Sequence, residues 1–228
     1  MILKVVKQKN PKNDVGSTPL HFASYSGHAD IFELLMDSVE DKNPKNDEGW
    51  TPLHSASMKG NTKICKMIVN TIKDINPVTN ADHTPLHVAA GQGHFDICKI
   101  IMECVNEKNP KDENGWTPLH FAARNGYTKV CNMIVNAIDE KNPKNNEGET
   151  PLYLSALHGH ANAYKAIMKY VKDKNPKMED SWTLLHYAAL KGHVQVCKEI
   201  SKAIGKLKQI SLITLDLKVH LGIMIGNY

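Results

Sequence analysis

"GWTPLHFAARNG", residues 115–126, is the stretch that decides how this chain folds. Thr117 is a favourable N-cap, because its hydroxyl can accept an unpaired amide of a first helical turn. Pro118 suits the first helical position, where its missing N–H costs nothing. Gly126 is placed to end a short helix in a left-handed conformation. The stretch therefore predicts a helix that begins after Thr117 and ends before Gly126.

The same stretch recurs with a period of 33 residues. Thr-Pro-Leu-His, or a close variant of it, begins at Thr18, Thr51, Thr84, Thr117, Thr150 and Thr183. An Asn-Pro pair stands upstream of each, with its asparagine at Asn10, Asn43, Asn76, Asn109, Asn142 and Asn175. A glycine stands downstream of each, at Gly27, Gly60, Gly93, Gly126, Gly159 and Gly192. Three features locked to one period indicate six copies of one structural unit.

Each unit is predicted to be a helix, a turn, a second helix and an extended loop. The second helix has apolar residues at helical spacing, for example Ile97, Ile100 and Ile101. The loop that contains Asn-Pro is rich in helix breakers. Neither helix can bury its apolar face within one unit, and small residues such as Ala122 and Ala123 allow a neighbouring unit to approach. Stacking of successive units into an all-α solenoid is the expected solution.

Residues 115–126 resemble the ankyrin-repeat pattern Gly-x-Thr-Pro-Leu-His-x-Ala-Ala-x-x-Gly-His. The resemblance covers about residues 10–205. It implies an ankyrin-repeat solenoid, in which helix-turn-helix units with finger-like turns stack into a curved rod. It also implies a non-enzymatic protein that binds other proteins on its concave face.

Four residues depart from the family pattern. Tyr153 replaces the histidine, and Leu184 replaces the helix-starting proline. Asp82 and Ser181 stand where the turn glycine belongs. These departures bear on the geometry of the third, fifth and sixth repeats, and not on the fold.

The two ends differ from the repeats. Residues 1–9 align with the second helix of a repeat, so we interpret them as the remnant of a truncated preceding repeat. Residues 10–205 hold the six ankyrin-like repeats, and residues 206–228 form a divergent apolar tail. The tail alternates apolar and other residues, which is strand spacing. It is an improvised cap, a peptide that pairs with another chain, or non-native sequence.

The composition excludes several classes of protein. The net charge of +4 falls well short of a dedicated nucleic-acid binder. No apolar run approaches the roughly 20 residues that span a bilayer, and the N-terminus lacks the apolar core of a signal peptide. We therefore expect a cytoplasmic protein, with the nucleus as the alternative, that does not insert into membranes.

Cysteines and histidines follow the repeat instead of gathering into a metal site. Cys65, Cys98, Cys131 and Cys197 occupy one repeat position, which Phe32 and Tyr164 fill in the other two copies. A position that accepts either cysteine or an aromatic ring belongs to a packed helix face, whereas Cys104 stands apart as a candidate exposed thiol. Nine histidines stand at the third residue of the first helix or after the turn glycine, where they hold caps and turns. We expect no metal, no cofactor and no catalytic site.

Two rows of lysines flank the Asn-Pro pairs. One row is Lys9, Lys42, Lys108, Lys141 and Lys174, and the other is Lys12, Lys45, Lys111, Lys144 and Lys177. Stacked in register, they are interpreted as a solvated edge. The alternative is an anion-binding track for nucleic acid or phosphoinositide, because rows of cations can neutralise phosphates.

The residue directly before the capping threonine is the candidate contact position. It is Trp50, Trp116 and Trp182 in alternate repeats, and Ser17, His83 and Glu149 in the others. A core site does not accept such different volumes, so we expect these side chains to be substantially exposed. Exposed tryptophan is enriched in protein interfaces.

The resemblance makes the last two residues of each first helix contact candidates as well. They are Tyr25 and Ser26, Met58 and Lys59, Gly91 and Gln92, Arg124 and Asn125, Leu157 and His158, and Leu190 and Lys191. The predicted partner-binding set is Trp50, Trp116, Trp182, His83, Tyr25, Met58, Lys59, Arg124, Asn125 and Lys191. We expect a protein partner of acidic or mixed charge, and a chain that is monomeric or part of a longer array. A structural spacer within a larger protein is the remaining alternative.

Overall fold

The computed structural model describes residues 10–178 and 181–205. Over these residues the chain is built from helices and has no strand, which confirms the predicted all-α class. The chain divides into two compact units, residues 1–118 and residues 119–228. The interpretations of residues 1–9 and 206–228 lie outside the described residues.

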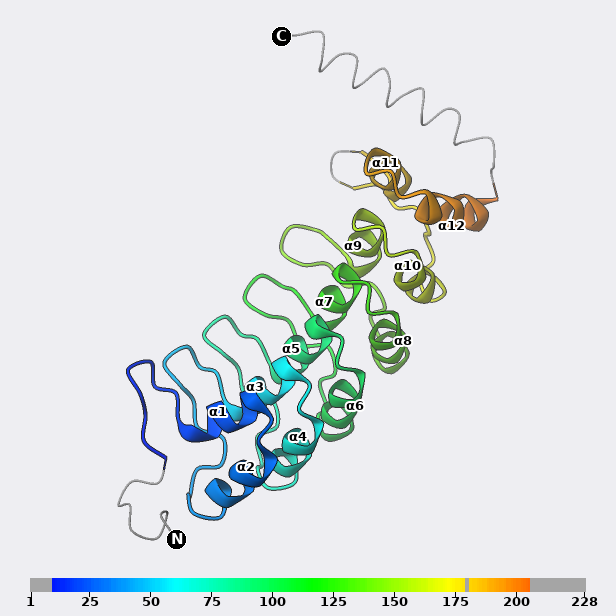
Figure 1. Cartoon of the computed structure of the whole chain (residues 1–228). Coiled ribbons are helices and arrows are strands. Elements are labelled where there is room, and N and C mark those ends of the chain that lie inside the picture. Colours follow the sequence, from blue (N-terminus) through cyan, green and yellow to red (C-terminus); the bar gives the residue numbers. More distant parts are fainter. Residues whose placement is uncertain (1–9, 179–180, 206–228) are drawn as a thin grey trace. The chain divides into compact units, whose positions relative to one another are not determined.

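The first unit contains three pairs of helices (Figure 1). They are α1 (Pro19–Ser26), α2 (Ala29–Met36), α3 (Pro52–Lys59), α4 (Thr62–Val69), α5 (Pro85–Gln92) and α6 (Phe95–Cys104). Helix α3 packs between α1 and α5, and α4 packs between α2 and α6. First helices and second helices therefore form two separate layers. Leu20, Leu53 and Leu86 of the first layer are fully buried, as are Ile64 and Ile97 of the second.

The second unit repeats this arrangement. Its helices are α7 (Pro118–Arg124), α8 (Thr128–Ala137), α9 (Pro151–Leu157), α10 (Ala161–Met168), α11 (Leu184–Leu190) and α12 (Val194–Ile204). Helix α9 packs on α11, and α10 packs between α8 and α12. Within this unit Leu119 and Leu152 of the first helices are fully buried, as are Ile134 and Ile167 of the second helices. Stacking of helix pairs, as predicted, buries the apolar faces within each unit.

The histidine of each Thr-Pro-Leu-His run joins two neighbouring repeats. The His54 backbone N–H donates to Thr51 Oγ1 at 3.4 Å, and the Thr51 N–H donates back to His54 Nδ1 at 3.2 Å. Since Nδ1 accepts, the ring proton is on Nε2, which donates to the carbonyl of His83 at 3.0 Å. The same capping box forms between Thr18 and His21, Thr84 and His87, and Thr183 and His186. The predicted capping role of these histidines is confirmed.

The asparagine of the Asn-Pro pair supplies a second cap. Asn43 Oδ1 accepts a hydrogen bond from the backbone N–H of Leu53 at 3.0 Å. Leu20, Leu152 and Leu185 make the same bond to Asn10, Asn142 and Asn175. Because this bond spans ten residues, it fixes the loop against the start of the first helix.

The four departures from the repeat pattern leave its backbone unchanged. Asp82 and Ser181 adopt φ values of 57° and 67°, the left-handed conformation of the glycines that they replace. Helix α11 begins at Leu184 without a proline, behind the Thr183 capping box. Tyr153 cannot supply the imidazole of a capping box, but its backbone N–H still donates to Thr150 Oγ1 at 3.2 Å. Non-glycine residues at positive φ carry strain of about 1–2 kcal/mol, so these repeats keep their geometry at a cost in stability.

Candidate functional site

The residue before each capping threonine has a fixed backbone and a variable side chain. The Trp50 carbonyl accepts from the Asn46 N–H at 2.8 Å, across the turn at residues 46–50 that we call the finger of this repeat. It also accepts from His21 Nε2 of the preceding repeat at 3.0 Å. Neither bond uses the side chain, which explains why tryptophan, serine, histidine and glutamate all occur at this position. The finger therefore accepts different side chains at this position without a change in these two backbone hydrogen bonds.

The tryptophans at this position are half-buried, so the expectation of substantial exposure is wrong in degree. The Trp50 ring lies 5.6 Å from the His54 ring, between centroids. The Trp182 ring lies 5.7 Å from that of His186 and 5.5 Å from that of Tyr187. Each of these indoles thus packs against its own first helix and keeps part of its surface open.

His83 occupies the same position and has a partner that the sequence analysis missed. Its Nε2 lies 3.1 Å from Asp112 Oδ2, and the Asp112 side chain is only 2 % exposed. Asp112 Oδ1 also accepts the Trp116 N–H at 2.8 Å, which orders the next finger. In another pair of repeats, Asn46 Nδ2 donates to Ser17 Oγ at 3.1 Å instead. In this array, residues that are 29 positions apart in the sequence contact each other in neighbouring repeats. This spacing is the signal that could have identified Asp112 as the partner of His83.

The predicted contact residues of the first helices lie at the helix ends. Lys59 Nζ lies 4.3 Å from the centroid of the Tyr25 ring, so these two candidates touch. Tyr25 is 50 % exposed, whereas Met58 is half-buried and its carbonyl accepts from His94 Nε2 at 3.2 Å.

In the second unit, three further candidates also lie at first-helix ends. Arg124, Asn125 and Lys191 are exposed at the ends of α7 and α11. The residues of the predicted partner-binding set that lie at helix ends are therefore exposed, apart from the half-buried Met58.

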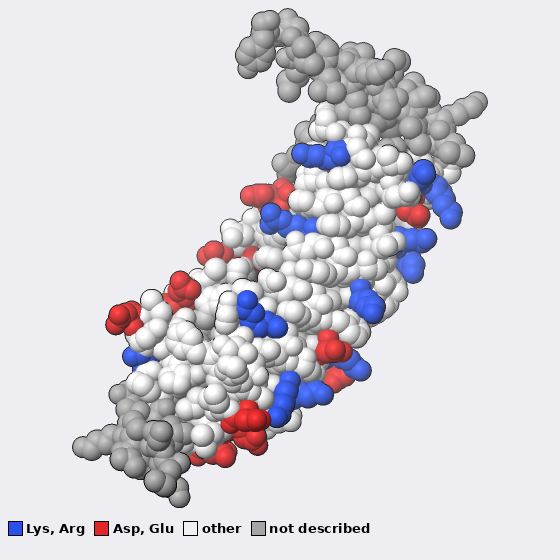
Figure 2. All heavy atoms as spheres, viewed as in Figure 1, with Lys and Arg blue, Asp and Glu red and all other residues white. Residues whose placement is uncertain are grey.

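The surface has mixed charge. Figure 2 shows Asp and Glu side chains at the outer ends of the fingers, and Lys and Arg mixed with them over the helices. The exposed acidic residues near the finger tips include Asp14, Asp47, Glu48 and Glu113. A single-sign field, as expected for a dedicated nucleic-acid binder, is not present on the face that Figure 2 shows.

Three lysines of one row are structural. Lys141 Nζ donates to the Val135 carbonyl at 2.8 Å, near the end of its own second helix. Lys42 and Lys174 donate in the same way to the carbonyls of Met36 and Met168. Because cations satisfy the free carbonyls at a helix C-terminus, these half-buried lysines act as helix caps. The interpretation of this row as a solvated edge is wrong for these three residues.

The second lysine row bridges fingers in the first unit. Lys12 Nζ donates to the Lys45 carbonyl at 3.3 Å, and Lys45 Nζ donates to the Val78 carbonyl at 2.8 Å. Both lysines are exposed. Their ammonium groups are thus partly engaged by backbone carbonyls, which does not favour a continuous track for phosphates.

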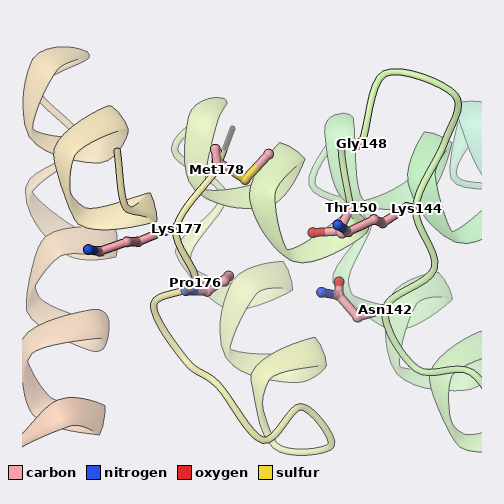
Figure 3. A pocket seen from close by; sticks show the side chains of 7 residues that line it. All are labelled: Asn142, Lys144, Gly148, Thr150, Pro176, Lys177 and Met178. Carbon is pink, nitrogen blue, oxygen red and sulfur yellow. The ribbon is translucent and has the colours of Figure 1, made fainter. Parts of the chain in front are cut away.

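A shallow pocket of about 330 Å³ lies between two fingers of the second unit. Asn142, Lys144, Gly148, Thr150, Pro176, Lys177 and Met178 line it. In Figure 3 the Lys177 side chain points away from that of Lys144. The two ammonium groups do not converge, so the pocket lacks the arrangement that would hold one anion between them.

The cysteines behave as the repeat register predicts, with one difference. Cys65, Cys98 and Cys131 are buried free thiols, and burial raises the pKa of each to about 12. Cys197 is only half-buried, and Cys104 is exposed. Within residues 10–178 and 181–205, no cluster of three His, Cys, Asp or Glu side chains could hold a metal ion. The described helices include none whose length and apolar content would let it cross a membrane.

Comparison with known families agrees with this geometry. The sequence matches the family model described as "Ankyrin repeats (3 copies)" over residues 2–81, 71–145 and 137–209. The chain belongs to the ankyrin-repeat family. Its stacked helix pairs are therefore an ankyrin solenoid, as the resemblance implied. No curated protein shows significant similarity to the chain. Ankyrin repeats are generally protein–protein interaction modules, and the family is typically non-enzymatic.

Proposed function

We propose that this ankyrin-repeat protein binds a protein partner, without catalysis, through its finger side chains and the ends of its first helices. The observation that carries the proposal is the position before the capping threonine. Two hydrogen bonds fix its backbone, as at Trp50, while its side chain differs from repeat to repeat. The part of each tryptophan side chain that stays exposed is available for contact with another molecule.

The chemistry of these positions supports an interface. Even half-buried tryptophans offer contact area with few rotatable bonds, and tryptophan is enriched among the residues that dominate binding energy. Their backbone is already ordered, so little conformational entropy is lost on binding. The mixed charge of the surrounding surface favours a partner of mixed charge.

The two alternatives have less support. An anion track along the lysine rows would need free ammonium groups, whereas Lys42, Lys141 and Lys174 donate to helix-end carbonyls. A structural spacer would have no use for tryptophans on the fingers. We further propose a cytoplasmic location, in keeping with five free cysteines.

A pull-down with identification by mass spectrometry tests the proposal. Wild type is compared with Trp50→Ala/Trp116→Ala/Trp182→Ala, and with a matched variant in which the exposed Lys66, Lys99 and Lys129 on second helices become alanine. Proteins captured by the wild type and by the lysine variant should be lost with the tryptophan variant, while its circular dichroism stays helical. Equal capture by the tryptophan variant would exclude the finger surface as the binding site.

A further inference from the structure

Asp112 differs from the residues at the matching position of the other five repeats. The residues at this position are Asn13, Asn46, Thr79, Asp112, Asn145 and Met178. Asn46 Oδ1 accepts the backbone N–H of Glu48 at 3.1 Å and that of Trp50 at 2.8 Å, and the other two asparagines make the same turn. The turn therefore needs one side-chain oxygen, which asparagine supplies as well as aspartate does.

The second carboxylate oxygen of Asp112 faces the preceding finger. Its Oδ1 accepts the N–H of Asn114 at 2.9 Å and that of Trp116 at 2.8 Å, as an asparagine would. Its Oδ2 lies 3.1 Å from His83 Nε2. Because a carboxylate only accepts, this imidazole nitrogen carries the proton and donates it. The Asp112 side chain is 2 % exposed, so donors from two fingers stabilise its charge in place of water.

The residue 29 positions earlier matches the chemistry of this second atom. In the first two repeats the turn residue is Asn46, whose Nδ2 donates to Ser17 Oγ at 3.1 Å. In the third and fourth repeats both residues are different, and the direction of donation is reversed, from His83 to Asp112. Donor and acceptor are thus exchanged together, which indicates that the two residues act as a pair. We call His83 and Asp112 the finger bridge.

The finger bridge is anchored on both sides by the capping histidines. The His83 carbonyl accepts from His54 Nε2 at 3.0 Å, and the Trp116 carbonyl accepts from His87 Nε2 at 3.1 Å. All of these residues belong to the first unit. A continuous series of hydrogen bonds therefore runs from the second repeat through the finger bridge to the backbone N–H of Trp116. Loss of the His83 ring would remove a donor from a buried carboxylate that also orders the Trp116 turn.

We propose that His83 is a positioning residue, which acts through Asp112 to hold the Trp116 finger in the conformation that the partner binds. This inference rests on the proposed function and changes the role expected of His83, from a contact to a support. The His83 side chain is 33 % exposed, so its exposure alone does not separate the two roles. Asp112 does separate them, because its buried side chain cannot touch a partner. An effect of Asp112 on binding must pass through the finger.

Hydrogen exchange of the tryptophan amides tests the finger bridge in the free protein. Labelling with ¹⁵N-tryptophan restricts the backbone amide signals to Trp50, Trp116 and Trp182. His83→Ala should speed exchange of the Trp116 amide about tenfold, which corresponds to about 1.4 kcal/mol, near the low end for a hydrogen bond to a charged group. The Trp50 amide, which Asn46 Oδ1 holds at 2.8 Å, is the internal control. Its exchange should change less than about twofold, because the opening is local.

Asparagine at position 112 separates the bridge from the turn. Asp112→Asn retains an oxygen for the Trp116 N–H but places an amide donor opposite His83, so it should speed exchange as much as His83→Ala does. The double variant His83→Ser/Asp112→Asn installs the serine–asparagine pair of the first two fingers, and should restore the wild-type rate to within about twofold. Lys111→Gln removes an exposed charge next to Asp112 in the sequence and should leave the rate unchanged. Equal exchange of the Trp116 amide in wild type, His83→Ala and Asp112→Asn would overturn the inference.

The pull-down then shows whether the position of the finger matters for binding. His83→Ala and Asp112→Asn should each reduce the captured proteins, and His83→Ser/Asp112→Asn should restore them. Full capture by Asp112→Asn, with loss in both variants that lack His83, would show that His83 is a direct contact and would overturn the positioning role.

The two proposals fail in different ways. If only the triple tryptophan variant loses its captured proteins and the exchange rates are equal, the proposed function stands and the finger bridge is wrong. Retention of the same captured proteins by the triple tryptophan variant would overturn the proposed function itself, whatever the exchange rates.

Discussion

Acidification should destabilise this protein through its buried capping histidines. Burial is the main reason that the pKa of His54 falls to about 4 and that of His87 to about 3, from 6.5. Lys45, His83 and His21 also lower the pKa of His54, whereas its bond to the His83 carbonyl raises it. Since the Thr51 N–H donates to Nδ1 of His54, protonation of that nitrogen would set one donor against another.

The sign and the size of the effect follow from proton linkage. These histidines bind a proton more weakly in the folded state than in the unfolded state. Their contribution to stability is therefore fully present above about pH 6.5 and is lost as the pH falls toward the folded-state values. Each histidine costs about 1.4 kcal/mol for each pH unit below 6.5. At about pH 5 each accounts for about 2 kcal/mol, and the two together for about 4, out of a typical 5–15 kcal/mol.

Urea unfolding, followed by circular dichroism between about pH 7.5 and about pH 5, measures this loss. The comparison variant is His54→Gln, because glutamine at this helical position can still accept the Thr51 N–H but does not titrate. Its free energy of unfolding should fall less steeply than that of the wild type, by up to about 1.4 kcal/mol for each pH unit. A free energy of unfolding that stays constant between about pH 7 and about pH 5 would refute the reasoning. So would an equal slope in the variant.

Further predictions concern the turns and the thiols. Gly159→Ala should lower the free energy of unfolding by at least about 1 kcal/mol more than Gly192→Ala, as measured by thermal unfolding. Both glycines have positive φ, but only a Cβ on Gly159 would meet an imidazole, at 2.6 Å. Equal losses in the two variants would contradict this packing. Asp82→Gly should raise the free energy of unfolding by about 0.5 kcal/mol, because it relieves a positive φ, and a destabilised variant would show that Asp82 carries no strain. A thiol reagent should label exposed Cys104 within minutes and buried Cys98 only in denaturant; rapid labelling of Cys98 in the native protein would contradict its burial.

The sequence predicts the parts of the structure that depend on backbone hydrogen bonds. Thr51 and His54 stand at a fixed spacing because a capping box requires it, so periodicity alone reveals their role. The lysine caps were missed because Lys141 lies in a loop, where the repeat period does not show which way a side chain points. Its ammonium group reaches back six residues to the Val135 carbonyl. The half-burial of Trp50 was missed because variation of the side chain at this position does not reveal that its ring can rest on the ring of His54.

The candidate site could be predicted only as positions, and not as contacts. The repeat period predicted that His83 lies on a finger. Its pairing with Asp112 could not be predicted in the same way, because Asp112 belongs to the next repeat. The same holds for Lys59 over the Tyr25 ring and for His193 against α9. Such contacts depend on which residues of two neighbouring repeats lie opposite each other. The 33-residue period alone does not give this pairing, because it does not say in which direction the repeats stack.

Site-specific photocrosslinking tests the central claim most directly. A benzoylphenylalanine at position 116 replaces Trp116 on a finger, and a second variant carries it in place of the exposed Lys66 on α4. If the fingers bind the partner, position 116 should give a covalent adduct with a captured protein and position 66 should give none. An adduct from position 66 alone would show that the partner binds the second helices, and would contradict the assignment of the fingers as the binding surface.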